Sequence, residues 1–150
     1  MTRLTTCACL LLLCIGVALG HRPQDEDRFA VAGLKDREVE QFYKEFREAV
    51  SAGDKKKVAS LVSFPIKVTL ASGKRRTIRT KADFVKLYDL IFDDTFRELI
   101  AKTEFADLWA KWSGVATPRG EIWINGIVKS AAKPDDYVIK IIAINNTWRS

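Results

Sequence analysis

All the cysteines of this chain lie within its first 20 residues: Cys7, Cys9 and Cys14. Those 20 residues have the pattern of a secretion signal, with Arg3 near the start, an apolar run over 10–17, and the small residues Ala18 and Gly20 before an expected cut after Gly20. The chain that follows contains no cysteine. Burial of apolar side chains, without disulfides, must therefore stabilise the fold.

The domain organisation predicted from this pattern is a signal peptide at 1–20, a polar leader at 21–35 and a single domain at 36–148. The apolar run is shorter than the roughly 20 residues that a membrane-spanning helix needs, so a secreted or periplasmic protein is expected. Lipid attachment at Cys14 is the alternative. The large Leu13 before Cys14 disfavours it, because that position normally holds a small residue.

Positive charge is concentrated in one segment of the chain. The chain has 25 basic and 19 acidic residues, and residues 54–81 carry nine of the basic ones with Asp54 as their one acid. This excess predicts a surface that contacts an anionic partner, with a solvated turn and helix face as the alternative interpretation. Nucleic acid is not expected, because aromatic residues do not alternate with these bases. The proposed contact residues are Lys55, Lys56, Lys57, Lys74, Arg75 and Arg76, followed by Arg79 and Lys81.

Apolar spacings predict two helices at the start of the domain. The first begins with Asp36 as its cap and ends at Gly53, with apolar residues three, four and seven positions apart. The second is shorter and opens at Asp54. We expect Pro65 to stop it, because the residue before a proline avoids helical geometry.

Two further helices follow an expected hairpin over 65–79. Thr80 caps a third helix that continues to Phe92, and Asp93 or Asp94 caps a fourth. The segment 103–109 fits either helical or extended spacing. Strand-favouring residues then predict three antiparallel strands separated by turns at 117–120 and 132–135: 109–116, 121–128 and 136–145. Together these elements predict an α+β fold, in which N-terminal helices pack in a strongly curved antiparallel sheet.

This order of elements resembles the nuclear-transport-factor-2-like superfamily, and more narrowly its small exported bacterial members of unassigned activity. The resemblance covers 36–147 and is carried by Phe64-Pro65 in the hairpin, by Gly-Glu-Ile-Trp-Ile-Asn at 120–125 and by the last strand at 139–145. It implies a cone-shaped fold whose sheet curls around the long helices and leaves a cavity open at one end. The superfamily includes ketosteroid isomerase, scytalone dehydratase and polyketide cyclases beside non-catalytic binding modules, so the fold alone does not define an activity.

The chain lacks the residues of most catalytic and metal sites. Its one histidine, His21, precedes the predicted domain, so the histidine–carboxylate pair of dehydratases cannot form. Without cysteine and a second histidine there is no zinc set and no thiolate nucleophile. We predict no catalytic residue, no metal and no cofactor.

An isomerase-like site would need a buried carboxylate base and a neutral donor. Tyr88 with Asp89, or Tyr43 with Asp93, are the available pairs. Both are disfavoured. Adjacent helix positions point about 100° apart, and Asp93 is more typical of a helix cap than of a base.

The residues predicted to bind a ligand are aromatic or amide side chains: Tyr43, Tyr88, Trp112, Trp123 and Asn125. Strand alternation places Trp123 and Asn125 on one face and Ile122 and Ile124 on the other. Either the isoleucines are buried and Trp123 joins Trp109 or Trp112 on an outer surface, or Trp123 and Asn125 face the cavity as a ligand platform. We favour the second arrangement.

The function expected from the sequence is that of an exported, non-catalytic small domain that binds a small apolar molecule or a protein partner. The alternative is a cofactor-free isomerase or lyase of the ketosteroid isomerase type, with a buried carboxylate base. A homodimer is expected by analogy with cone-fold relatives that pair through their sheets.

Overall fold

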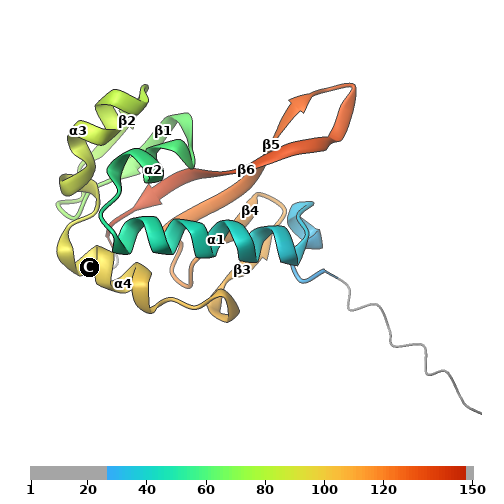
Figure 1. Cartoon of the computed structure of the whole chain (residues 1–150), viewed down its shortest axis with the longest axis horizontal. Coiled ribbons are helices and arrows are strands. Elements are labelled where there is room, and N and C mark those ends of the chain that lie inside the picture. Colours follow the sequence, from blue (N-terminus) through green and yellow to red (C-terminus); the bar gives the residue numbers. More distant parts are fainter. Residues whose placement is uncertain (1–26, 148–150) are drawn as a thin grey trace, which may run out of the picture.

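The computed structural model describes residues 27–147, in which helices pack against a six-stranded sheet (Figure 1). The predicted signal peptide and His21 lie outside these residues. No helix within them is long and apolar enough to cross a membrane. The elements, in order, are η1 (Ala30–Ala32), α1 (Asp36–Ser51), α2 (Lys55–Ser60), β1 (Val62–Thr69), β2 (Arg75–Ile78), α3 (Lys81–Ile91), α4 (Asp94–Lys102), η2 (Phe105–Asp107), β3 (Trp109–Lys111), β4 (Gly114–Ala116), β5 (Ile122–Ser130) and β6 (Lys133–Asn145).

Side-chain caps start three of the helices, as the sequence predicts. The carboxylate of Asp54 accepts a hydrogen bond from the Lys57 amide at 2.9 Å, and Asp93 accepts one from the Phe96 amide at 3.0 Å. The Thr80 hydroxyl likewise accepts a bond from the amide three residues later. Capping satisfies amides that have no partner within the helix. These local bonds therefore fix the starts of α2, α3 and α4.

The predicted start of α1 and the predicted end of α2 are wrong in detail. Asp36 is the first residue of α1 and not its cap, and its carboxylate accepts a hydrogen bond from the Phe29 amide at 3.0 Å. Helix α2 ends at Ser60, and Pro65 lies within β1. The strand begins early because Val62 pairs with Ile141 of β6, a contact between distant segments that the proline signal does not report.

The sheet has the strand order β2-β1-β6-β5-β4-β3. All neighbours are antiparallel except β1 and β6, which pair in parallel. The α+β class is confirmed, and the prediction of a wholly antiparallel sheet is wrong. The last strand returns to the middle of the sheet beside β1, and an apolar pattern carries no information about the direction of such a distant partner.

Two strand boundaries also differ from the prediction. The segment 109–116 forms two strands that turn back on each other at 112–113, with Lys111 opposite Gly114. Strand β6 begins at Lys133, which pairs with Ser130, so the turn occupies 131–132 and overlaps only the first residue of the predicted 132–135 segment. Strands β5 and β6 therefore make a long ribbon that extends beyond the rest of the sheet (Figure 1).

Part of the predicted leader belongs to the folded domain. Phe29 and Leu34 are buried in the core. The Arg28 guanidinium donates to the Phe105 carbonyl at 2.8 Å and lies 4.6 Å from the centre of the Phe29 ring. The domain start predicted at residue 36 is too late, because two apolar residues within a polar stretch gave no periodic signal.

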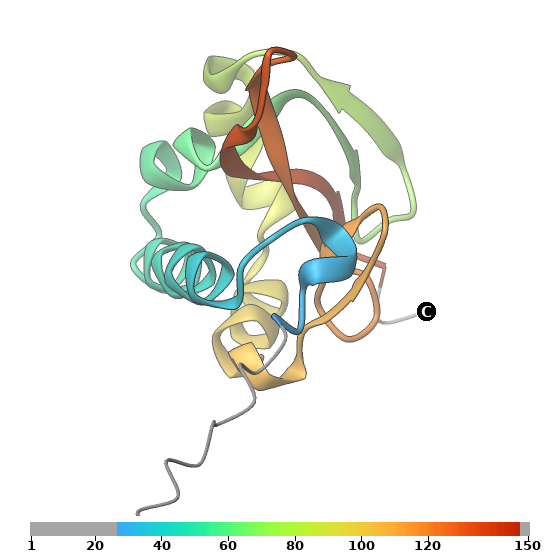
Figure 2. The same cartoon turned by 90° about the vertical axis from the view of Figure 1, so that its right-hand side faces the viewer.

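The core lies between the helices and one face of the sheet (Figure 2). Along β1, Ile66 and Val68 are buried while Lys67 between them is exposed, which identifies the inner and outer faces. Aromatic side chains from the helices fill the inner layer, and Phe92 lies among them. The rings in contact with Phe92 are Phe46, Phe84, Tyr88 and Phe96.

Candidate functional site

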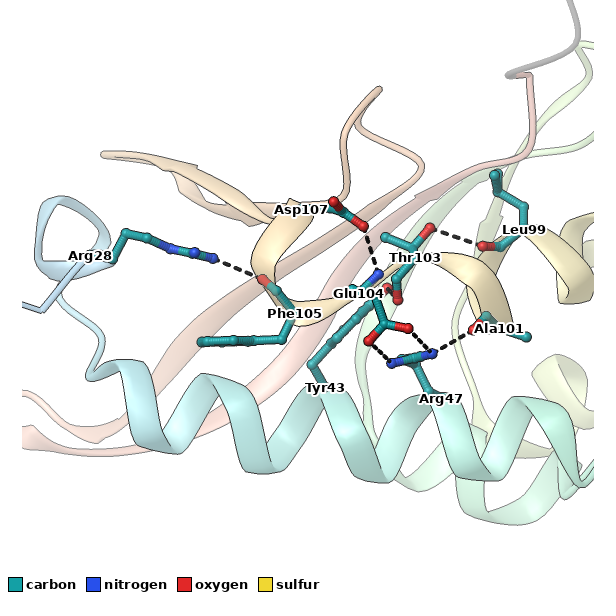
Figure 3. Close-up of polar contacts among 9 residues, drawn as sticks. All are labelled: Arg28, Tyr43, Arg47, Leu99, Ala101, Thr103, Glu104, Phe105 and Asp107. Atoms are coloured by element: carbon teal, nitrogen blue, oxygen red, sulfur yellow. Dashed lines mark hydrogen bonds and ion pairs between the residues drawn. The ribbon is translucent and has the colours of Figure 1, made fainter.

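The two tyrosines predicted to bind a ligand are core residues. The Tyr43 hydroxyl points to the end of α4, where it donates to the Thr103 carbonyl at 3.4 Å (Figure 3). Tyr88 stacks on Phe92, and its buried hydroxyl has no hydrogen-bond partner within residues 27–147. Burial raises the pKa of both phenols, that of Tyr88 to about 12. Both phenols therefore stay neutral at ordinary pH.

The polar groups around Tyr43 join two helices. Arg47 on α1 donates to both carboxylate oxygens of Glu104, at 3.0 and 3.1 Å, and to the Ala101 carbonyl at 2.5 Å (Figure 3). A bidentate arginine contact of this kind fixes geometry as well as adding energy. The cluster holds α1 against the end of α4, and its role is structural.

The structure contradicts the favoured arrangement of β5. Ile122 and Ile124 are fully buried, so Trp123 is on the outer face, where its ring meets Trp109 edge-on at 5.4 Å. Lys111 lies 4.7 Å from the centre of the Trp123 ring. The isoleucines take the inner face because they bury more apolar surface without a polar group to satisfy. Trp123 is therefore not part of an internal ligand platform.

The other two predicted ligand residues are also apart from the core tyrosines. Trp112 is 82% exposed in the turn between β3 and β4. The Asn125 amide donates to the Ser113 carbonyl at 3.3 Å, which steadies that same turn. None of the five predicted residues lines the surface hollows described below. They do not form one site.

Neither tyrosine–carboxylate pair forms a catalytic centre. Asp89 is exposed and binds Lys55 at 2.6 Å, while Asp93 caps α4 and accepts a hydrogen bond from the Asn146 amide at 2.9 Å. The most buried carboxylate in the described residues is that of Glu121, which sequence reasoning did not single out.

Glu121 holds a turn together. Its carboxylate accepts hydrogen bonds from the Thr117 hydroxyl at 2.6 Å and from the Arg119 amide at 3.1 Å. These bonds close the 117–121 connection between β4 and β5. Within residues 27–147, no three His, Cys, Asp or Glu side chains gather as they would around a metal ion.

Three adjoining surface hollows form the strongest candidate site. The first, of about 390 Å³, lies between α2 and α3; the second, of about 540 Å³, lies between α3 and β2; the third, of about 490 Å³, lies on the outer face of β1, β2 and β6. Lys86 lines the first two hollows, and Arg76 lines the last two. We call the cations along them the basic band: Lys56, Lys67, Arg75, Arg76, Arg79, Lys81 and Lys86.

The positive charge of the basic band is almost uncompensated. No residue of the band makes an ion pair within residues 27–147. The one acid in the lining, Asp83, accepts a hydrogen bond from the Thr80 hydroxyl at 2.7 Å in the cap of α3. Cations gathered in this way raise the local concentration of anions and favour their binding.

Five of the eight predicted contact residues belong to this band, Arg79 and Lys81 among them. Lys56, Arg75 and Arg76 line its hollows, whereas Lys55 and Lys57 are held in ion pairs with Asp89 and Glu45. Lys74 is exposed outside the lining. Sequence reasoning missed Lys67 and Lys86, which are brought to the band by strand pairing and by the position of α3. Comparison of the chain with family models, with curated proteins and with solved structures gave no significant match.

Replacing Tyr88 with phenylalanine is expected to stabilise the protein by about 1 kcal/mol at neutral pH, because it removes a buried hydroxyl that has no partner. It is also expected to weaken the loss of stability between pH 10 and 12. In that interval the unfolded phenol ionises while the folded one, with its pKa raised to about 12, stays protonated, so the wild type loses stability as pH rises.

Urea unfolding at pH 7, 10 and 11.5 measures both effects. Tyr137→Phe is the control at pH 7, because the Tyr137 hydroxyl donates to Glu38 at 2.5 Å and its removal brings no gain there. Destabilisation of the Tyr88 variant at pH 7 would show that its hydroxyl is satisfied.

Proposed function

We propose that this protein is an exported, non-catalytic binding domain whose basic band holds an extended anionic partner. The observation that carries the proposal is the basic band itself: seven cations without ion pairs among residues 27–147, along three adjoining hollows. The basic band does not stabilise the fold, because like charges placed side by side repel one another.

The shape of the band favours a chain of negative charges over a single small anion. The hollows follow one another from the α2–α3 groove, across β2, to the outer face of the sheet, where Lys67 of β1 lies between Thr77 and Ala143 of the neighbouring strands. A small anion would engage one hollow. An extended polyanion contacts the lysines and also the arginines, whose planar guanidinium groups bind carboxylate, sulfate or phosphate oxygens in pairs.

The cone-shaped, nuclear-transport-factor-2-like fold remains part of this proposal. It is supported by the order of elements, by the helices gathered on one side of the sheet, and by register shifts in the β1–β6 and β5–β6 pairs, which are typical of bent strands (Figure 2). The non-catalytic role is supported by the contacts of Asp89, Asp93 and Glu121, each of which is occupied by a structural bond. A homodimer through the outer sheet face stays a prediction.

Titration of a labelled heparin oligosaccharide, used as a model polyanion, tests the proposal. We expect the wild type to bind it at 50 mM salt. Neutralising four band residues in one protein, the band variant, is expected to weaken binding roughly 30-fold, because each exposed contact contributes about 0.5 kcal/mol. The changes are Lys67→Gln, Arg75→Gln, Arg76→Gln and Arg79→Gln.

A control variant with the same change in net charge separates the band from overall charge. It carries glutamine at four exposed lysines outside the band: Lys35, Lys102, Lys129 and Lys133. We expect it to bind heparin within about threefold of the wild type, the effect of a general loss of charge. Equal weakening in the two variants would contradict a defined binding band.

A further inference from the structure

The hollow between α2 and α3 differs from the rest of the basic band in having an apolar floor. The floor is formed by Ala59 of α2 and by Ala82 and Val85 of α3. The small side chains of the two alanines leave the space between the helices unfilled. At about 390 Å³, the hollow is within the usual range of small-molecule sites, roughly 300–1,000 Å³.

Cations border this floor on both sides. Lys56 of α2 and Lys81 and Lys86 of α3 line the hollow, and none of the lining residues is acidic. Lysine side chains lay their hydrocarbon stems along apolar surface and hold their charges at its edge. A ligand that matches both features has a hydrocarbon part for the floor and a negative charge for the rim.

Lys140 of β6 contacts the end of α2. The Lys140 ammonium donates to the Ser60 carbonyl at the end of α2, at 2.6 Å. Burial lowers its pKa first, and the charges of Lys81 and Lys57 lower it further, against the opposing effect of Glu45. The charges of Lys81 and Lys57 therefore act against a further cation at this end of α2.

We propose that the groove between α2 and α3 binds a long-chain carboxylate, with its hydrocarbon chain on the floor of Ala59, Ala82 and Val85 and its carboxylate among the three lysines. This inference deepens the proposed function and rests on it, because Lys56, Lys81 and Lys86 belong to the basic band. It identifies one end of the band as a site for an amphiphilic anion and leaves the arginine-lined remainder for polyanions.

Calorimetric titration of the purified protein with dodecanoate below its micelle concentration tests the inference. We expect saturable binding of one dodecanoate per chain. Shortening the ligand to octanoate is expected to weaken binding roughly fourfold for each buried methylene removed. The uncharged dodecyl maltoside, which carries the same hydrocarbon chain, is expected to bind at least about tenfold more weakly, because it cannot pair with the lysines.

Two variants locate the binding. Ala82→Trp places an indole in the groove and is expected to weaken dodecanoate binding at least tenfold, while Ala101→Trp, at an exposed position of α4, leaves it unchanged. The double variant Lys81→Gln with Lys86→Gln keeps the floor and is expected to lose three- to tenfold in affinity. Absence of dodecanoate binding, or equal binding by wild type and both groove variants, would overturn the inference.

Heparin titration of the same proteins separates this inference from the proposed function. Ala82→Trp is expected to keep heparin binding, because the arginine-lined hollows remain open. Heparin binding without any dodecanoate binding would refute the groove and leave the polyanion function standing. Dodecanoate binding without heparin binding would refute the polyanion function and leave the groove standing as a site for an amphiphilic anion.

Discussion

Replacing Phe92 with alanine is expected to lower the free energy of unfolding by roughly 3–5 kcal/mol. Phe92 is fully buried, and four aromatic rings contact it, with centroids between 5.0 and 6.4 Å away. Its loss would leave a cavity that α1, α3 and α4 cannot close together, because each contributes rings to its walls. A loss of this size is a large part of the 5–15 kcal/mol that stabilises a typical domain.

Urea unfolding followed by far-ultraviolet circular dichroism measures this loss. Leu90→Ala is the control, since Leu90 is two residues away on α3 and half exposed, and its loss is expected to cost less than about 1 kcal/mol. A similar small cost for Phe92→Ala would mean that the aromatic cluster does not form the core.

Replacing Gly114 with alanine is expected to cost roughly 2–4 kcal/mol. Gly114 has a φ of 134°, a conformation that residues with a side chain rarely adopt, and an added Cβ would lie 2.5 Å from the Ile124 carbonyl oxygen. The backbone must therefore shift at the start of β4, where the neighbouring Val115 pairs with Ile124.

Gly73→Ala separates the steric clash from the effect of backbone conformation. Gly73 also has a positive φ, of 78°, but an added Cβ there meets nothing within 4 Å, so only about 1–2 kcal/mol is expected. Equal costs at the two glycines, measured by urea unfolding, would contradict the close approach of β4 to β5.

The helices were predictable because their signals are local. Asp54, Thr80 and Asp93 each bond an amide three residues ahead, and that distance is visible in a sequence. The turn at 117–120 is local in the same sense. Asp36 shows the limit of such signals, because its carboxylate bonds an amide seven residues earlier, outside the usual capping pattern.

The strands of the sheet were predictable, but the face that each strand buries and the order in which the strands pair were not. Alternation separates Trp123 from Ile122 and Ile124 without saying which face meets the helices. That choice depends on the apolar surface that α1 and α3 present, which no single strand encodes. The parallel pairing of β1 with β6 is set by the path of the whole chain, and so is the end of α2 at Ser60.

The candidate site, like the fold, was predictable only in the part whose signal is local in the sequence. A cluster of bases in residues 54–81 is visible in the sequence, and it correctly directs attention to Arg75 and Arg76. The positive charge available for binding depends on which cations form ion pairs with acidic side chains in the folded protein. Lys55 and Lys57 are paired with acids on α3 and α1, whereas Lys67, within the run of bases, and Lys86, beyond it, line the hollows of the band.

The dependence of heparin affinity on salt concentration measures directly how many cations of the basic band contact a polyanion. Each contact that releases a counterion contributes roughly −0.7 to −0.9 to the slope of log affinity against log salt. With all seven cations engaged, we expect a slope of roughly −5 to −6 for the wild type and for the control variant, and of roughly −2 to −3 for the band variant. A slope near zero in the wild type, or one slope shared by all three proteins, would contradict a polyanion-binding band.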